Sequence, residues 1–199
     1  MKDVTIIDQA VPKSIQDILE NITRGDKMNW FRQERATYGD NAPGVFPVTP
    51  TSRDLPQFTH TIYEIDKPVS QLFHVLLPVI TAIPYTVKQL IRIKMNLGVY
   101  TLLDNPEVHG MPHVDFTKVA EPLLTAIYYV NDSSGDTIIF DQRFGASGPL
   151  TIKQRVPHKK GRLVVFDGRL LHAGNTPRDN TPRININFNA FIYEGAKAD

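Results

Sequence analysis

A histidine and a carboxylate stand two positions apart at His113 and Asp115, and a second histidine, His172, follows 59 positions after His113. Side chains alternate between the two faces of a strand, so a strand over residues 110–116 would point His113 and Asp115 to the same side. Two imidazoles and one carboxylate are the ligands of non-haem Fe(II) sites that keep coordination positions open. We therefore predict a metal site at these three residues. The alternative for His113 and Asp115 alone is a surface turn with two solvated polar side chains.

A polar strand is predicted shortly after the second histidine, because residues 183–189 alternate between polar and apolar side chains. The polar positions are Arg183, Asn185, Asn187 and Asn189, and the apolar ones are Ile184, Ile186 and Phe188. Asparagine has poor β propensity, so this polar face suits the wall of a cavity better than an exposed edge strand, which is the alternative. The guanidinium of Arg183 can form a bidentate pair with a carboxylate, and we expect it to hold a dicarboxylate cosubstrate against the metal.

The composition narrows the class of protein. The chain has 199 residues, a length typical of one domain, and its 22 basic residues nearly balance its 21 acidic ones. This balance disfavours a nucleic-acid partner. The absence of cysteine excludes disulfides, iron–sulfur clusters and thiol catalysis. Neither a signal peptide nor a stretch long enough to span a membrane is recognisable, so we expect a cytoplasmic protein with no membrane partner.

The N-terminal part is predicted to begin with an amphipathic helix over residues 14–23, with Ser14 and Asp17 as a capping box and Gly25 at its end. Residues 26–57 lack a periodic pattern, and we expect a long ordered arm or a lid. The arm contains aromatic side chains that would suit a substrate wall, although such clusters are more often core. They are Trp30, Phe31, Tyr38 and Phe46.

A strand is predicted over residues 58–65, followed by a second amphipathic helix between Pro68 and Pro84 that Pro78 should kink or split. From residue 88 onward, short β-rich runs are separated by turn residues. The expected strands are 89–97, 110–116, 123–130, 136–141, 149–154, 162–167, 170–174 and 183–192. Eight short strands indicate a sandwich or barrel, with the N-terminal helices covering one face of a sheet.

With these motifs in place, the sequence resembles the 2-oxoglutarate/Fe(II)-dependent dioxygenases, and in particular the prolyl 4-hydroxylase-like branch. The order His113, Asp115, His172 and Arg183 matches the H-x-D…H…R/K pattern of that family. Thr125–Asn131 is similar to the family's strand after H-x-D. Ser134–Thr137 is similar to a variant of its Gly-Gly-Glu-Thr turn, and Gly161–Asp167 is similar to its strand before the distal histidine. The resemblance covers residues 88–193.

The resemblance implies a mainly β fold with supporting α-helices: a double-stranded β-helix, or jelly roll, flanked by N-terminal helices. We expect residues 1–199 to form one oxygenase domain, with the arm and supporting helices in 1–87 and the β-helix core in 88–193. Fe(II) would be held by the three metal ligands, and 2-oxoglutarate would chelate it. Arg183 would pair with the C5 carboxylate of 2-oxoglutarate, and Tyr129 would be a hydrogen-bond partner.

Other polar residues are candidates for the same pocket. Asn96 and Tyr100 stand where the family often places a second cosubstrate contact, and Asn185 shares the face of Arg183. Lys94 is a candidate contact to cosubstrate or substrate, with an exposed strand face as the alternative. The resemblance also implies O₂ as cosubstrate and leaves open a stimulatory effect of ascorbate.

The function implied is hydroxylation of a C–H bond, in a prolyl or another amino-acid side chain of a peptide or protein, with release of succinate and CO₂. The alternatives are an oxygenase of the same superfamily acting on a small metabolite or a nucleobase, an iron enzyme without 2-oxoglutarate, or a non-catalytic cupin-like binding protein. Nucleic-acid demethylases of this superfamily typically carry a second arginine in the final strand, where this chain has Asn189. No feature of the sequence predicts an oligomeric state.

Overall fold

The computed structural model describes residues 4–37, 46, 49, 51–64, 66–100, 108–117 and 121–193. Its largest element is an eight-stranded sheet in the order β1-β11-β8-β13-β6-β4-β2, with β5 paired to β4. These strands are β1 (Thr5–Ile7), β2 (Phe31–Gln33), β4 (Gln57–Glu64), β5 (Lys67–Pro68), β6 (Val87–Gly98), β8 (Leu123–Tyr129), β11 (Leu163–Asp167) and β13 (Arg183–Ile192). All the pairings within this sheet are antiparallel.

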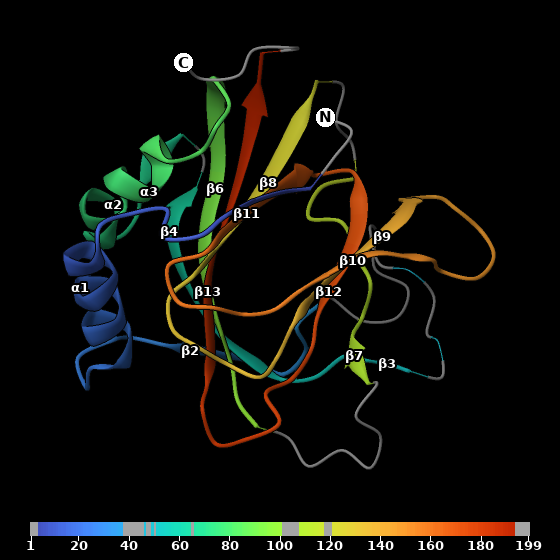
Figure 1. The fold of residues 1–199 in the computed structure, drawn as a ribbon, viewed down its shortest axis with the longest axis horizontal. Coiled ribbons are helices and arrows are strands. Elements are labelled where there is room, and N and C mark those ends of the chain that lie inside the picture. Colours follow the sequence, from blue (N-terminus) through green and yellow to red (C-terminus); the bar gives the residue numbers. More distant parts are fainter. Residues whose placement is uncertain are drawn as a thin grey trace.

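Two smaller sheets complete the β structure. The first has the order β10-β9-β12 and is antiparallel, while the second is a parallel pair of two-residue strands, β3 and β7. The strands are β3 (Ser52–Arg53), β7 (His109–Gly110), β9 (Thr137–Arg143), β10 (Ile152–Val156) and β12 (Leu170–Gly174). In Figure 1 the small sheets lie on the right of the large sheet and the helices on its left. This arrangement agrees with the predicted jelly roll with flanking helices.

The main hydrophobic core lies between the large sheet and the helices. The helices are α1 (Lys13–Arg24), α2 (Leu72–Val75) and α3 (Leu77–Thr81). Leu19 of α1 and Val79 of α3 pack in one cluster with Ile184, Ile186 and Phe188, the apolar face of β13. The alternation of residues 183–189 therefore gives β13 the two faces that were predicted. Its apolar face packs against the helices, and its polar face points away from them, toward the β10-β9-β12 sheet.

The helix predictions are confirmed in position and corrected in detail. The first helix begins at Lys13 after Pro12, and no side chain caps it, so the predicted capping box is wrong. Asp17 instead accepts hydrogen bonds from the ammonium groups of Lys13 and Lys160. The predicted second helix is split at Leu76 into α2 and α3, and Pro78 lies in the first turn of α3, where a missing N–H costs nothing.

The strand predictions match seven of the eight runs, with one shift. The run predicted at 149–154 is β10, which starts at Ile152. The prediction of a strand over 110–116 is wrong: β7 ends at Gly110, and beyond it His113 forms an isolated bridge with His172. The chain thus leaves the β3-β7 sheet at Gly110, before it reaches His113 and Asp115.

The arm over residues 26–57 is less irregular than predicted, because it contributes β2 and β3 to two of the sheets. The aromatic side chains of the arm that the structure describes do not form one cluster. Trp30 packs against the main core and Phe46 against the cluster around Val114, whereas Phe31 is exposed. Tyr38 lies outside the described residues. Within the described part of the chain, no helix is long and apolar enough to cross a membrane.

Candidate active site

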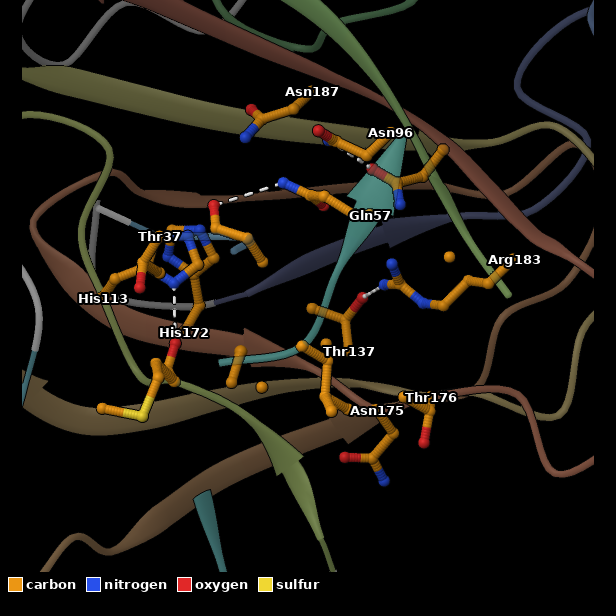
Figure 2. Close-up of a pocket in the computed structure, with 18 of the residues that line it drawn as sticks. Thr37, Gln57, Asn96, His113, Thr137, His172, Asn175, Thr176, Arg183 and Asn187 are labelled. Carbon is orange, nitrogen blue, oxygen red and sulfur yellow. Dashed lines mark hydrogen bonds between the residues drawn. The ribbon is translucent and has the colours of Figure 1, made fainter. Parts of the chain in front are cut away.

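Two segments that lie far apart in the sequence carry the histidines of the predicted metal site. The backbone N–H of His113 donates to the carbonyl of His172, and the N–H of His172 donates to the carbonyl of His113, both at 3.0 Å. One ligand-type atom from each of His113, Asp115 and His172 lies within 4.8 Å of the others. The structure thus brings the three predicted ligands together at one end of a cavity, where Figure 2 shows the two imidazoles side by side.

The orientation of both imidazoles suits a metal. Nδ1 of His113 donates to the carbonyl of Met111 at 2.8 Å, and Nδ1 of His172 donates to the carbonyl of Leu170 at 3.2 Å. These bonds place the proton on Nδ1 and leave Nε2 of each ring with a free lone pair. Burial, with the neighbouring His172, lowers the pKa of His113 to about 4, so this ring is neutral at neutral pH. The donor set therefore fits a divalent cation.

Asp115 is the most heavily bonded group of the site. Its Oδ1 accepts from the guanidinium of Arg92 at 2.6 Å, and its Oδ2 accepts from the amides of Asn187 at 3.1 Å and Asn189 at 2.9 Å. Burial by itself raises the pKa of this carboxyl, but Arg92 and the two histidines outweigh burial and hold it well below its usual value. Asp115 is thus a fixed anion, and two asparagines of the polar strand serve to orient it.

Arg183 lies at the other end of the cavity (Figure 2). Its Nε donates to the carbonyl of Gly135 at 3.1 Å, and its Nη2 donates to Oγ1 of Thr137 at 2.7 Å. A Cβ at Gly174 would stand 3.2 Å from Nη1, so glycine gives the guanidinium room. No carboxylate of the described residues forms an ion pair with Arg183, and burial lowers its pKa. A guanidinium that lines a cavity and has no ion-pair partner among the described residues can bind an anionic ligand there.

Thr137 links Arg183 to Tyr129, and the sequence analysis gave it no role. Its Oγ1 also accepts from the hydroxyl of Tyr129 at 2.7 Å. With both lone pairs of Oγ1 occupied, the Thr137 hydroxyl must direct its own proton elsewhere, and the residue lines the cavity. Burial raises the pKa of Tyr129 to about 12, which keeps it a donor. Tyr129 itself is not among the lining residues, so it supports the pocket through Thr137 and does not face it.

The remaining candidates divide into two groups. Asn96 and Asn185 both line the cavity, and the Asn96 amide donates to Oδ1 of Asn185 at 3.2 Å. Tyr100 does not belong to the cavity lining and has an exposed side chain, so its predicted contact has no support in this geometry. Lys94, for which an exposed strand face was the alternative, lines the cavity. From the N-terminal arm, Thr37 and Gln57 close one side of the cavity (Figure 2).

Arg92 is another residue of the site to which the sequence analysis gave no role. It stands on β6, two positions before Lys94, and its contact to Asp115 spans 23 positions. The alternation of Arg92, Lys94 and Asn96 along the strand was a usable signal for one shared polar face. The partner of each residue could not be inferred, because it depends on β6 lying beside β13.

No protein-family model matches the chain, and no curated protein matches its sequence. Solved structures do match its fold. One is the epimerase SnoN in complex with Fe3+, alpha ketoglutarate and nogalamycin RO, at 13% identity and a TM-score of 0.59, covering 96% of this chain and 82% of SnoN. It is a protein of the nogalamycin pathway.

Two prolyl hydroxylases also match. The enzyme from Trichoplax adhaerens, solved with a hypoxia inducible factor peptide fragment, has 12% identity and a TM-score of 0.58, with 96% of this chain and 84% of that chain covered. A prolyl-4-hydroxylase from Pseudomonas putida has 15% identity and a TM-score of 0.52, with 97% and 94% covered. At these identities the likeness concerns the fold. The predicted resemblance is confirmed at that level: the chain has the jelly-roll fold of the 2-oxoglutarate/Fe(II) oxygenases, prolyl hydroxylases included.

Proposed function

We propose that the protein is a 2-oxoglutarate- and Fe(II)-dependent dioxygenase that hydroxylates a C–H bond of its substrate and releases succinate and CO₂. The observation that carries the proposal is the placement of two sites in one cavity: three metal-ligand candidates at one end and the buried guanidinium of Arg183 at the other. A jelly-roll binding protein would need neither site, and an iron enzyme without 2-oxoglutarate would have no use for Arg183.

The residues that would hold the metal are His113, Asp115 and His172. When bound, the iron together with 2-oxoglutarate and O₂ supplies the oxidising power of the reaction. The protein orients the ligands: the carbonyls of Met111 and Leu170 fix the two rings, and Arg92 with the asparagines fixes the carboxylate. Outer partners of this kind typically contribute about 10–100-fold to metal affinity.

Arg183 and Thr137 would hold the C5 carboxylate of 2-oxoglutarate. The guanidinium supplies a charge-assisted hydrogen bond, and the Thr137 hydroxyl adds a second donor because Arg183 and Tyr129 occupy both its lone pairs. Asn96 and Asn185 extend along the cavity wall between the two ends. The contacts of Arg183 and Thr137 would exclude water from the C5 carboxylate and would orient 2-oxoglutarate so that its other end binds the metal.

For the substrate, we propose a peptide or protein side chain, such as a prolyl residue, or a small molecule. The matched prolyl hydroxylase was solved with a peptide fragment and SnoN with nogalamycin RO, so the fold accommodates both classes. The cavity wall formed by Thr37, Leu55 and Gln57 belongs to the N-terminal arm. This arm is where we place substrate contacts, because loops around a rigid scaffold carry specificity.

The test is anaerobic addition of Fe(II) and then 2-oxoglutarate to the purified protein. A visible metal-to-ligand charge-transfer band should appear with the cosubstrate and should be absent in Asp115→Ala. Admitting O₂ should convert 2-oxoglutarate to succinate. A protein that forms no band rules out the proposal, whereas a band without succinate under any substrate screen favours the non-catalytic binding protein.

A further inference from the structure

Lys94 occupies the middle of the polar face of β6. Arg92, Lys94 and Asn96 alternate along this strand, and Lys94 lies between Thr61 of β4 and Asn187 of β13 in the ladder. Its two neighbours on the face are already engaged, Arg92 by Asp115 and Asn96 by Asn185. Lys94 lines the cavity, and within the described residues its ammonium group makes neither a hydrogen bond nor an ion pair.

The strand register places Lys94 within the cavity. Asn187 stands opposite Lys94 in the ladder and donates to Asp115, and Arg92, two residues before Lys94, donates to Asp115 as well. Lys94 thus belongs to the metal end of the cavity. Burial, with the nearby Arg92, lowers its pKa, which reflects a cation whose lost hydration is not replaced by a partner.

The charges of the cavity do not balance without a further anion. Arg92 offsets Asp115, and the two positive charges of Fe(II) are offset by the two carboxylates of 2-oxoglutarate. A histidine that binds a metal does so through the neutral imidazole, so His113 and His172 would add no charge. Asp136 acts on Arg183, so Lys94 is left as an uncompensated positive charge in the cavity. Such a field attracts anions and raises their local concentration.

Two buried acceptors near Lys94 add a second requirement. Oδ1 of Asn187 and Oδ1 of Asn96 have no hydrogen-bond partner in the part of the chain that the structure describes. Asn187 stands directly opposite Lys94, and its amide group is turned toward Asp115, so its carbonyl oxygen is left for another donor. 2-Oxoglutarate has only acceptors and cannot satisfy these oxygens. A ligand that does so must bring an N–H or O–H group.

We propose that Lys94 anchors a carboxylate of the substrate, and that the substrate class is carboxylic acids with a nearby N–H or O–H donor, as in amino acids, hydroxy acids or the C-terminal residue of a peptide. The ion pair with Lys94 places a neighbouring C–H bond at the metal end of the cavity. This inference rests on the proposed function and makes Lys94 a specificity-determining residue.

The experiment measures binding, not turnover. The anaerobic complex with Fe(II) and 2-oxoglutarate is titrated with a panel of free amino and hydroxy acids and with the primary amide of each. A second panel contains short peptides with a free or an amidated C-terminus. Binding is read as a shift of the charge-transfer band and of the thermal midpoint. At least one carboxylate should bind ten-fold or more tightly than its amide. If it belongs to the first panel the substrate is a free acid, and if it belongs to the second the substrate is the C-terminus of a peptide.

Three variants assign that preference to Lys94. Lys94→Met should reduce the ratio of carboxylate affinity to amide affinity to two-fold or less. Lys94→Arg should retain this ratio because the cation remains. Lys88→Met is the matched control: Lys88 lies on the same strand but pairs with Glu121 at the surface, so the preference should be unchanged. The thermal midpoint of each variant without ligand verifies that it is folded.

The proposal is overturned if no member of either panel is preferred to its amide, or if Lys94→Met leaves the preference intact. It is also overturned if Lys94→Met weakens 2-oxoglutarate without affecting the panels, because Lys94 then serves the cosubstrate. If the charge-transfer band does not form in the unsubstituted protein, both proposals fail. A normal band with no carboxylate preference removes only the role of Lys94.

Discussion

His113 and His172 exchange both hydrogen bonds of a two-residue antiparallel bridge, at 3.0 Å each. This contact fixes the spacing of the two backbones, and the hydrogen bonds of Nδ1 to the carbonyls of Met111 and Leu170 orient the rings. Their ring centroids are 4.7 Å apart, and the ring of Phe166 packs against His172 from the side at 5.2 Å. The metal-ligand candidates are therefore preorganised before any ion binds, which reduces the ordering cost of binding.

Because the ligands are preorganised, Fe(II) should stabilise the folded protein. At an ion concentration about 100 times the dissociation constant, the free energy of unfolding should increase by about 2.7 kcal/mol. Urea unfolding under anaerobic conditions with and without Fe(II) measures this gain. His113→Ala should lose it, whereas His74→Ala, on the exposed side of α2, should retain it. An equal gain in the two variants would show that the ion binds elsewhere.

Arg183→Met should separate cosubstrate binding from metal binding. The variant removes the charge that is proposed to meet the C5 carboxylate, and truncating one partner of a buried charge pair costs about 2–5 kcal/mol. The affinity for 2-oxoglutarate, titrated through the charge-transfer band, should fall by about 30-fold or more. Fe(II) affinity should change little, since Arg183 lies at the far end of the cavity. Unchanged affinity for 2-oxoglutarate would contradict the assignment.

Thr137→Val should reduce both stability and cosubstrate affinity. The substitution keeps the volume of the side chain but removes the acceptor that serves the buried Tyr129 hydroxyl and Arg183. Leaving such donors unpaired costs about 1–3 kcal/mol of unfolding free energy. The measurements are urea unfolding and the 2-oxoglutarate titration. Thr137→Ser retains the hydroxyl and should preserve cosubstrate affinity, so a loss of that affinity in both variants would indicate a packing defect.

His158 should make stability depend on pH. It is stacked on Tyr129 with ring centroids 4.1 Å apart, and burial followed by the charge of Arg183 holds its pKa well below 6.5. The unfolded chain therefore binds a proton below pH 6.5 that the folded chain does not bind. Its contribution to stability is present above pH 6.5 and is lost as the pH falls below that value, by at most about 1.4 kcal/mol per pH unit.

The check is urea unfolding of the metal-free protein between pH 7.5 and 5. His158→Gln should flatten the decline in this range. His74→Gln is the control, because the His74 side chain is exposed and its substitution should leave the pH profile unchanged. A His158→Gln profile parallel to that of the unsubstituted protein would show that this histidine is protonated in the folded state.

The polar wall of the cavity could be predicted because it follows from the order of residues within one strand. The alternation of residues 183–189 fixes which side chains share a face, since successive residues of a strand point in opposite directions. The apolar positions then determine which face is buried against the helices. Local chemistry also predicted the split of the second helix, because Pro78 favours the first turn of a helix, and it lies in the first turn of α3. The capping box was wrong, because Asp17 pairs with Lys13 and with the distant Lys160.

The sequence by itself determined the types of the site residues: the two histidines and the aspartate, the arginine after them, and the polar face to which the arginine belongs. Only the tertiary structure decided which of these faces meet. Arg92 reaches Asn189 because β6 pairs with β13, and it reaches Asp115 because the segment after β7 is bridged to β12 at His113 and His172. Thr137 joins Arg183 to Tyr129 because β9 faces the large sheet. The physical reason is that strand neighbours are selected by burial of whole apolar faces, an energy summed over many distant residues. No single motif contains that information.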